Sequence, residues 1–203
     1  MPGPDDGLGK EAEKKIRTWL NQPRAGYSFD RIPDQMTGHY QVSRNICDFV
    51  CFKSPYIYYI ESKATFEDRF DFSNISQKQH DGLLGKSLID FCYGIVIVLF
   101  ATHHRAFILD IQDIYVLKES GQKSINIKKI DSWALPYIEI PTVKSRKKLY
   151  DYQGDFSELV ETLMFNKSDI KYDIPEKYLD MLVPNSDKSN SKGDESSIIE
   201  LEL

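Results

Sequence analysis

The sequence has few cysteines and no long hydrophobic run, and each shortage excludes a class of protein. Its three cysteines, Cys47, Cys51 and Cys92, form no CxxC pair, so we expect buried free thiols rather than a disulfide framework or a zinc motif. No apolar run reaches the roughly 20 residues that a membrane-spanning helix requires. The first residues lack the hydrophobic core of a signal peptide, so we expect a cytoplasmic protein with no membrane partner.

The sequence also has no excess of basic over acidic residues. The chain carries 26 Lys and Arg residues against 31 Asp and Glu residues, which gives a net charge of −5 at pH 7. The segment from residue 168 to the end holds nine of these acids and only four lysines, so the remainder carries no net charge. Because phosphate binding depends on local clusters of positive charge, this composition still permits a nucleic-acid partner.

Length and hydrophobic periodicity predict a single domain over residues 8–183, because 203 residues are enough for one substantial core. A Pro/Gly/Asp-rich segment, 1–7, and an acidic tail, 184–203, have the composition of disordered chain. The alternation of helical and strand patterns predicts an α/β fold with a mixed central sheet flanked by helices. We expect helices near 8–20, 73–90, 110–118 and 156–165 (the last of them), strands near 27–32, 45–63, 91–100 and 106–109, and a loop at 64–72.

Two apolar runs around a Lys-Ser-Pro break, Ile46–Phe52 and Tyr56–Ile60, predict a β-hairpin. Asp48 interrupts the first run, and Glu61 follows the second. Charged groups in strands this apolar are costly unless they are paired or bind a metal, so function is expected here first. A loop over residues 53–56 places Asp48 opposite Glu61, whereas a loop one residue longer or shorter turns Asp48 to the other face.

This hairpin carries the pattern Asp-x12-Glu-x-Lys. Asp48 and Glu61 offer hard anionic oxygens suited to Mg²⁺ or Mn²⁺, and the backbone carbonyl of Ser62 can be a third ligand. Lys63 shares a strand face with Glu61, so it can contact an attacking water and a scissile phosphate. The pattern therefore predicts a metal-dependent phosphodiesterase centre. The alternative is a solvated salt bridge between Glu61 and Lys63, which leaves Asp48 unexplained.

Five segments surround these residues in one order: RIPDQMTG at 31–38, SRNICDF at 43–49, YYIESKA at 58–64, FSNISQKQHDGL at 72–83 and GIVIVLF at 94–100. Together they resemble the PD-(D/E)xK nuclease superfamily and, within it, the RecU-type Holliday junction resolvases, especially the short phage-encoded relatives. The resemblance implies a restriction-endonuclease-like fold. It also implies a Mg²⁺-dependent endodeoxyribonuclease, with Mn²⁺ possible, that acts as a homodimer on branched DNA in recombination and repair.

The resemblance also implies roles for individual residues. Asp48 and Glu61 would be metal ligands, Lys63 the catalytic lysine, and Gln79 a helix glutamine near the site. Glu13 would hold a ligand through water or bind a second metal, although in isolation it is better explained as a solvated residue beside the apolar stripe of the first helix. DNA contacts are expected at Arg31, in the same segment as Asp34, and at Arg44 and Lys78. The basic run 143–148 adds Lys144, Arg146 and Lys147 as DNA-backbone contacts, with a solvated surface as the alternative.

The chain departs from the family pattern in three places. Cys47 stands where relatives have proline, and Ser62 replaces the more usual Ala or Cys. The segment 24–44 is too short for the basic stalk that larger relatives insert into the junction centre. Two alternatives therefore stay open: a nickase or restriction-type endonuclease on duplex DNA, and a non-catalytic DNA- or protein-binding module of the same fold.

Overall fold

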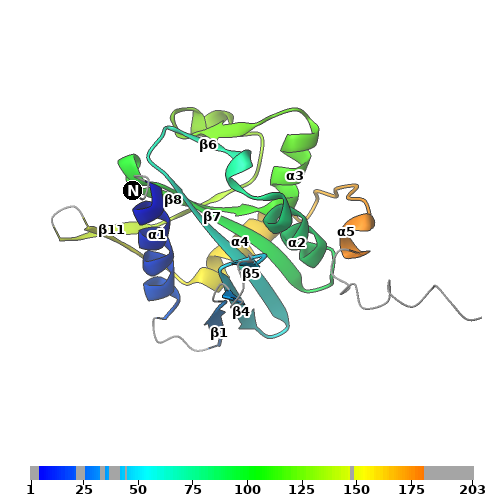
Figure 1. Ribbon diagram of the computed structural model, residues 1–203, viewed down its shortest axis with the longest axis horizontal. Helices are drawn as coiled ribbons and strands as arrows, with labels where there is room; N and C mark the ends of the chain where they lie inside the picture. Colours follow the sequence, from blue (N-terminus) through cyan, green and yellow to red (C-terminus); the bar gives the residue numbers. More distant parts are fainter. Residues whose placement is uncertain are drawn as a thin grey trace, which may run out of the picture.

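A computed structural model of the chain describes residues 5–21, 26–32, 35–36, 42–43, 45–146 and 149–180. Its centre is a sheet in the strand order β1-β4-β5-β7-β8-β10 (Figure 1). The strands are β1 (Ser28–Arg31), β4 (Phe49–Lys53), β5 (Tyr56–Thr65), β7 (Cys92–Phe100), β8 (Arg105–Asp110) and β10 (Ile138–Ile140). Only β5 and β7 pair in parallel, so the sheet is mixed.

Helices cover both faces of this sheet, and the described residues also form three separate two-stranded sheets. The α-helices are α1 (Asp5–Leu20), α2 (Gln77–Ser87), α3 (Ile111–Glu119), α4 (Phe156–Asn166) and α5 (Lys177–Asp180). The paired strands are β2 (Gln35–Met36) with β3 (Val42–Ser43), β6 (Arg69–Asp71) with β9 (Ser124–Asn126), and β11 (Thr142–Arg146) with β12 (Leu149–Tyr152). Short 3₁₀ turns lie at η1 (Phe72–Asn74), η2 (Ala101–His103) and η3 (Ile127–Ser132).

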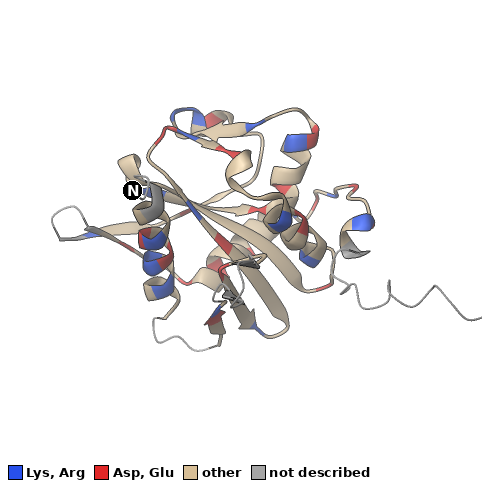
Figure 2. Cartoon of the chain, viewed as in Figure 1, with Lys and Arg blue, Asp and Glu red and all other residues tan. Residues whose placement is uncertain are grey.

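Two hydrophobic clusters lie on the two faces of the sheet, because successive side chains of a strand point to opposite sides. Ile95 and Ile97 of β7 pack with α1 and α4, whereas Val96 and Val98 pack with α2 and α3. Charged residues are frequent on the helices and sparse along the central strands (Figure 2). Any charged side chain on a central strand therefore needs a specific explanation.

The close approach of α2 to β7 depends on Gly94. A Cβ atom there would lie 2.7 Å from the carbonyl oxygen of Leu83 in α2 and 2.7 Å from Ile111 of α3. Glycine is thus required where both helices meet the sheet. This contact fixes the position of α2, whose first turn carries Gln79 to Glu61 and Lys63 of β5.

The architecture predicted from the sequence, a mixed sheet flanked by helices, is confirmed. The hairpin loop over residues 53–56 and the strands predicted near 27–32, 91–100 and 106–109 are also confirmed, and Asp110 caps the helix predicted near 110–118. All three cysteines are free and buried. Among the described residues, no helix is long and apolar enough to cross a membrane.

Four predicted details are wrong. The first helix begins at Asp5 rather than Leu8. The segment predicted as a loop at 64–72 completes β5 and then forms β6, because its backbone pairs with β9 from a distant part of the chain. The second helix spans only Gln77–Ser87, and α5 follows the helix predicted to be last. The predicted tail, 184–203, lies outside the described residues.

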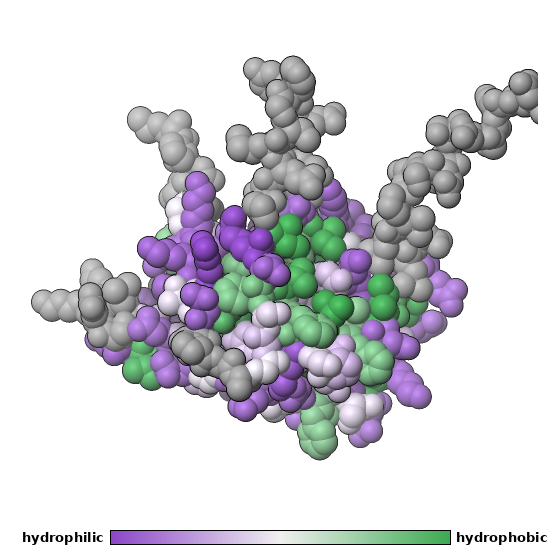
Figure 3. Space-filling view, turned by 90° about the horizontal axis from the view of Figure 1, so that it is seen from below, coloured by the Kyte–Doolittle hydropathy of each residue, from purple (hydrophilic) through white to green (hydrophobic). Residues whose placement is uncertain are grey.

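The exposed apolar side chains are not scattered evenly. Seen from below, hydrophobic residues gather near the middle of one face, with polar residues around them (Figure 3). Large apolar side chains with substantial exposure include Phe52 of β4 and Phe91, which precedes β7.

A buried ionic cluster ties the C-terminal segment to the sheet. Lys167, which follows α4, is 7% exposed and contacts Asp110 as well as Asp113, at 2.9 Å for Asp113. Tyr172 donates a hydrogen bond to the other oxygen of Asp113. Burial raises the pKa of Asp113 to about 6, and the nearby Lys167 ammonium opposes this shift. Removing the lysine would leave two buried carboxylates without their cation.

Replacing Lys167 by Met should therefore destabilise the fold by roughly 3–5 kcal/mol at about pH 8, above the pKa of Asp113. The loss should shrink below about pH 6, because Asp113 can then take up a proton. Urea denaturation followed by circular dichroism measures both values. The exposed Lys171→Met change is the control and should cost under about 0.5 kcal/mol. Equal stability of the two variants would show that the cluster contributes nothing.

Candidate active site

The site begins with the hydrogen-bond register between β4 and β5. β4 and β5 pair from Phe49 with Ile60 onward, and the N–H of Asp48, which directly precedes β4, donates to the Ile60 carbonyl at 2.9 Å. The backbone N–H of Ser62 donates to Asp48 Oδ2 at 2.7 Å. The Asp48 carboxylate is thereby held beside the residue that follows Glu61, and both acids line one cleft.

Glu61 is only 2% exposed, which is rare for a glutamate. Its Oε1 atom lies 2.9 Å from Lys63 Nζ and accepts a hydrogen bond from Gln79 Nε2. Its Oε2 atom is buried and has no hydrogen-bond partner among the described residues. Burial, and secondly the charge of Asp48, raises the pKa of Glu61 to about 8. A buried acid with one oxygen unused is poised to bind a cation.

Asp48 is half-buried beside it. Burial raises the pKa of Asp48 to about 6, although the Ser62 N–H opposes this shift by stabilising the charged form. The negative charge of Glu13, on α1, raises the pKa values of both Asp48 and Glu61. Three acids thus affect one another electrostatically at this point, and a divalent cation would relieve their repulsion.

Lys63 and Gln79 complete the polar cluster. Gln79 Oε1 accepts from Lys63 Nζ at 3.1 Å and from the backbone N–H of Ser76 at 3.1 Å. Ser76 is the N-cap of α2, and its side chain accepts from the backbone N–H of Gln79, so the two residues form a capping box. The start of α2 therefore positions Gln79, and Gln79 in turn positions Glu61 and Lys63.

Asp48, Glu61, Ser62, Lys63, Gln79 and Glu13 all line one cleft of about 840 Å³. Glu13 forms an ion pair with Arg31 at 2.9 Å, which joins α1 to β1. The carboxylates of Asp48 and Glu61 supply oxygen atoms to the cleft, and hard oxygen ligands suit Mg²⁺ or Mn²⁺. The described residues contain no group of three or more His, Cys, Asp and Glu side chains arranged to hold a metal. A metal here would thus rely on two carboxylates and the Ser62 carbonyl.

The residues expected to contact DNA are only partly brought together. Arg31 lies beside the cleft through its pair with Glu13, and Lys78 is exposed on the first turn of α2. Lys144 is exposed on β11 and does not line the cleft. The backbone of Arg146 lies on the same strand, and its side chain is outside the described set. Arg44, Lys147 and Asp34 lie outside the described residues.

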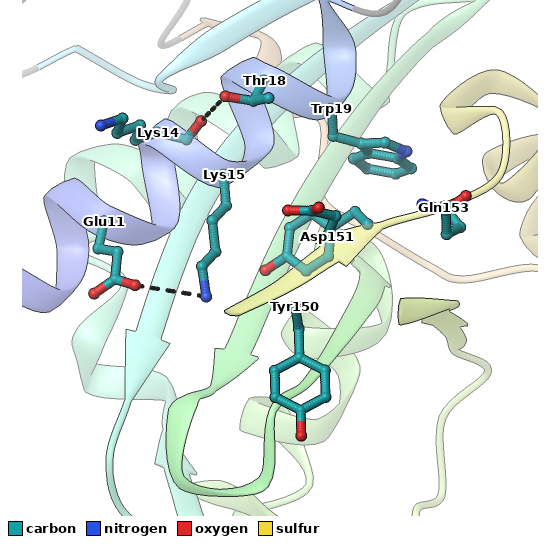
Figure 4. A pocket seen from close by; sticks show the side chains of 9 residues that line it. Glu11, Lys14, Lys15, Thr18, Trp19, Tyr150, Asp151 and Gln153 are labelled. Carbon is teal, nitrogen blue, oxygen red and sulfur yellow. Dashed lines mark hydrogen bonds and ion pairs between the residues drawn. The ribbon is translucent and has the colours of Figure 1, made fainter. Parts of the chain in front are cut away.

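A second pocket, of about 590 Å³, lies between α1 and β12 (Figure 4). Its lining mixes acids with bases, and Lys15 is paired with Glu11 at 3.6 Å. The indole N–H of Trp19 donates a hydrogen bond to the Gly154 carbonyl at 3.0 Å. This balance of charge selects no particular ligand, so the cleft around Glu61 is the better candidate for the functional site.

The sequence analysis missed several residues of the cleft. Ser76 is the clearest case, because the spacing Ser-x-x-Gln from Ser76 to Gln79 is itself a capping-box signal. Phe66 and Arg69 also line the cleft, from the segment that was predicted as a loop. No local sequence pattern around Phe66 or Arg69 indicates that they line the cleft.

Comparison with known proteins gives one family match. The RecU family model, described as recombination protein U, matches residues 23–145, which is more than half of the chain. None of the curated proteins matches the chain significantly. Among solved structures, the chain is similar to Archaeoglobus fulgidus Hjc, described as a Holliday junction resolvase from an archaeal hyperthermophile. The TM-score is 0.43 and the identity 17%, over 59% of this chain and 89% of that one.

Replacing Glu61 by Gln should stabilise the metal-free protein in alkaline solution. The pKa of Glu61 rises from its ordinary value of 4.5 to about 8 in the folded state. The stability contributed by the neutral acid is therefore fully present below pH 4.5 and is lost as the pH rises through about 8.

Neutral Gln avoids this loss, so its free energy of unfolding in EDTA at about pH 9 should exceed that of the parent by about 1 kcal/mol or more. Urea denaturation at several pH values measures the difference, which should vanish in acid. Glu67→Gln, an exposed change of the same charge, is the control. If the parent and Glu61→Gln have the same free energy of unfolding at about pH 9, burial of a charged Glu61 costs nothing and the prediction is wrong.

Proposed function

Because the chain belongs to the RecU family, we propose that it is a metal-dependent DNA endonuclease that resolves Holliday junctions or other branched DNA in recombination and repair. One observation carries the proposal: the buried, unpartnered oxygen of Glu61 lies in a cleft that also holds Asp48 and Lys63. A binding module has no physical need for such a costly group.

We propose Asp48, Glu61 and the Ser62 carbonyl as the metal ligands. The unpartnered Glu61 Oε2 and the mutual repulsion of the two carboxylates fit a divalent cation, Mg²⁺ or Mn²⁺. When bound, such a cation lowers the pKa of a water and neutralises charge on the phosphate that is attacked. The Ser62 N–H holds Asp48 in place at 2.7 Å from Oδ2, so the ligand is oriented in advance.

Lys63 would act on the substrate. Its ammonium lies at the cleft, held by Glu61 Oε1 and Gln79 Oε1, and can donate to a phosphate oxygen or to the attacking water. Positive charge fixed in this position stabilises the negative charge that develops during hydrolysis. Gln79 would be the positioning residue, because its amide contacts both Glu61 and Lys63.

Glu13 would act from the margin of the cleft. Since it pairs with Arg31, it would hold a ligand through water or a second metal less directly than the other two acids hold the first. Arg31, Lys78 and the basic residues near β11 would contact the DNA backbone. A symmetric junction needs two cuts and each site makes one, so we propose a homodimer, acting in the cytoplasm.

A panel of substrates tests the function. The purified protein with Mg²⁺, Mn²⁺ or EDTA is incubated with four-way junction, nicked, flap and linear duplex DNA of matched sequence. We expect cleavage of the branched substrates with metal and none in EDTA. Equal cleavage of linear duplex would overturn the junction proposal, and no cleavage of any substrate would overturn the nuclease proposal.

Asp48→Asn should abolish cleavage and keep DNA binding, because the change weakens metal occupancy without altering the DNA-facing cations. A loss of roughly 100-fold or more is expected, comparable with the loss of a key electrostatic group in other enzymes. Asp30→Asn is the matched control, since Asp30 is exposed on the neighbouring strand β1. Junction cleavage and gel-shift assays give the two readouts. Parent-like cleavage by Asp48→Asn would refute the site assignment.

Lys63→Ala should slow cleavage and leave the metal site filled. The variant retains both carboxylates and the Ser62 carbonyl, so Mn²⁺ binding, measured by calorimetry, should persist. An Arg substitution should restore part of the rate if charge at this position is what matters. Loss of metal binding in Lys63→Ala would instead assign the lysine a purely structural role.

A further inference from the structure

Phe66 stands out among the residues of the cleft because it is apolar. It follows the last residue of β5 and lines the same cleft as Glu61 and Lys63. It is 50% exposed and belongs to neither hydrophobic cluster of the described chain. An aromatic ring with no packing role at the margin of a polar cleft needs another explanation.

The backbone that carries this ring is held firmly. The Thr102 hydroxyl donates to the Phe66 carbonyl at 2.6 Å, and the Glu67 N–H donates to Thr65 Oγ1 at 3.0 Å. The next residue, Asp68, is bonded on both sides: its side chain contacts His103 and Lys128, and its carbonyl accepts from the Ile127 N–H at 2.8 Å. All three residues between β5 and β6 are thus anchored, while the ring remains exposed.

We propose that Phe66 stacks on a base that is unstacked at the branch point, and so sets the preference of the site for branched over linear DNA. The inference rests on the proposed nuclease function and assigns a specificity-determining residue to it. Base–aromatic stacking tolerates any base sequence, because every base has a π-face. A rigid loop makes this contact at little cost in conformational entropy.

Distance supports the same assignment. Phe66 lies three residues beyond Lys63, which is roughly 10 Å along an extended strand. Stacked DNA advances about 3.4 Å per nucleotide, so the ring lies within roughly three nucleotides of a phosphate held by Lys63. In a regular duplex the faces of bases at that distance are covered by their neighbours, and only their edges are accessible. At a branch point a base face is open, as in single strands.

Four variants of Phe66 test the proposal: Ala and Leu remove the π-face, whereas Tyr and Trp keep it. With Mg²⁺, Phe66→Ala and Phe66→Leu should lower kcat/KM on the four-way junction by about 5- to 150-fold. Cleavage of nicked or linear duplex should stay within about twofold of the parent, and Tyr and Trp should preserve junction cleavage. Phe165→Ala, a change at an aromatic residue 79% exposed on α4, is the control and should have no effect.

A second readout does not require cleavage. A junction carrying 2-aminopurine beside the branch point is titrated with the full-length protein in EDTA, and stacking on Phe66 should quench its fluorescence. Phe66→Leu should bind without quenching. If Phe66→Leu matches the parent in both junction cleavage and fluorescence quenching, the inference is overturned and the nuclease proposal stays intact. If the parent protein cleaves no substrate, the proposed nuclease function is overturned. The fluorescence titration then still decides the role of Phe66, and a parent protein that does not bind the junction would contradict that role.

Discussion

The hydrogen-bond register between β4 and β5 is the constraint on which this site depends. A slip of one residue would turn Asp48 to the opposite face of the sheet, away from Glu61. The register is secured because Phe49 and Ile60 both pack in the hydrophobic cluster on the α1 side, and a slip would take Phe49 out of that cluster. Burial of these two apolar residues therefore helps to bring the two acids into one cleft.

The same strands explain why the pKa values of these acids are raised. β5 lies between β4 and β7, so Glu61 is surrounded by backbone that is already hydrogen-bonded within the sheet. Little is left to solvate its charge except Lys63 and Gln79. A cation supplied from solution would complete the set. The cost of burying the Glu61 charge would thus favour the binding of a cation in the proposed site.

Much of this arrangement could be predicted from the sequence, and the reason is local. The β4–β5 hairpin, the buried strand β7 and the helix capped by Asp110 each follow from the spacing of apolar residues and from their neighbours. Asp48, Glu61 and Lys63 attract notice because they interrupt or follow those apolar runs. The roles of Gln79 and Glu13 came only from the family resemblance, since neither residue differs locally from an ordinary helix residue.

The failures are equally physical. β6 is short and polar, and it becomes a strand only by pairing with β9, more than 50 residues later. Lys167 and Asp110 are similarly separated, so no local pattern announces their buried contact. Phe66 was assigned to a loop over the site, and nothing nearby indicates that Thr102 would hold its backbone. Contacts of this kind arise from tertiary structure and override local preference.

The double use of Gln79 has one more consequence. Its carbonyl oxygen accepts from Ser76 and Lys63 while its amide group donates to Glu61, and among side chains of this length only a carboxamide offers both functions. A glutamate would add a further negative charge to the acids already in the cleft, and a lysine could not accept a hydrogen bond. The same amide starts the helix, so fraying of one helical turn would disconnect Lys63 before the sheet opens. The enzyme would then lose its alignment while still folded, and amide hydrogen exchange at Gln79, measured beside activity, would reveal that state.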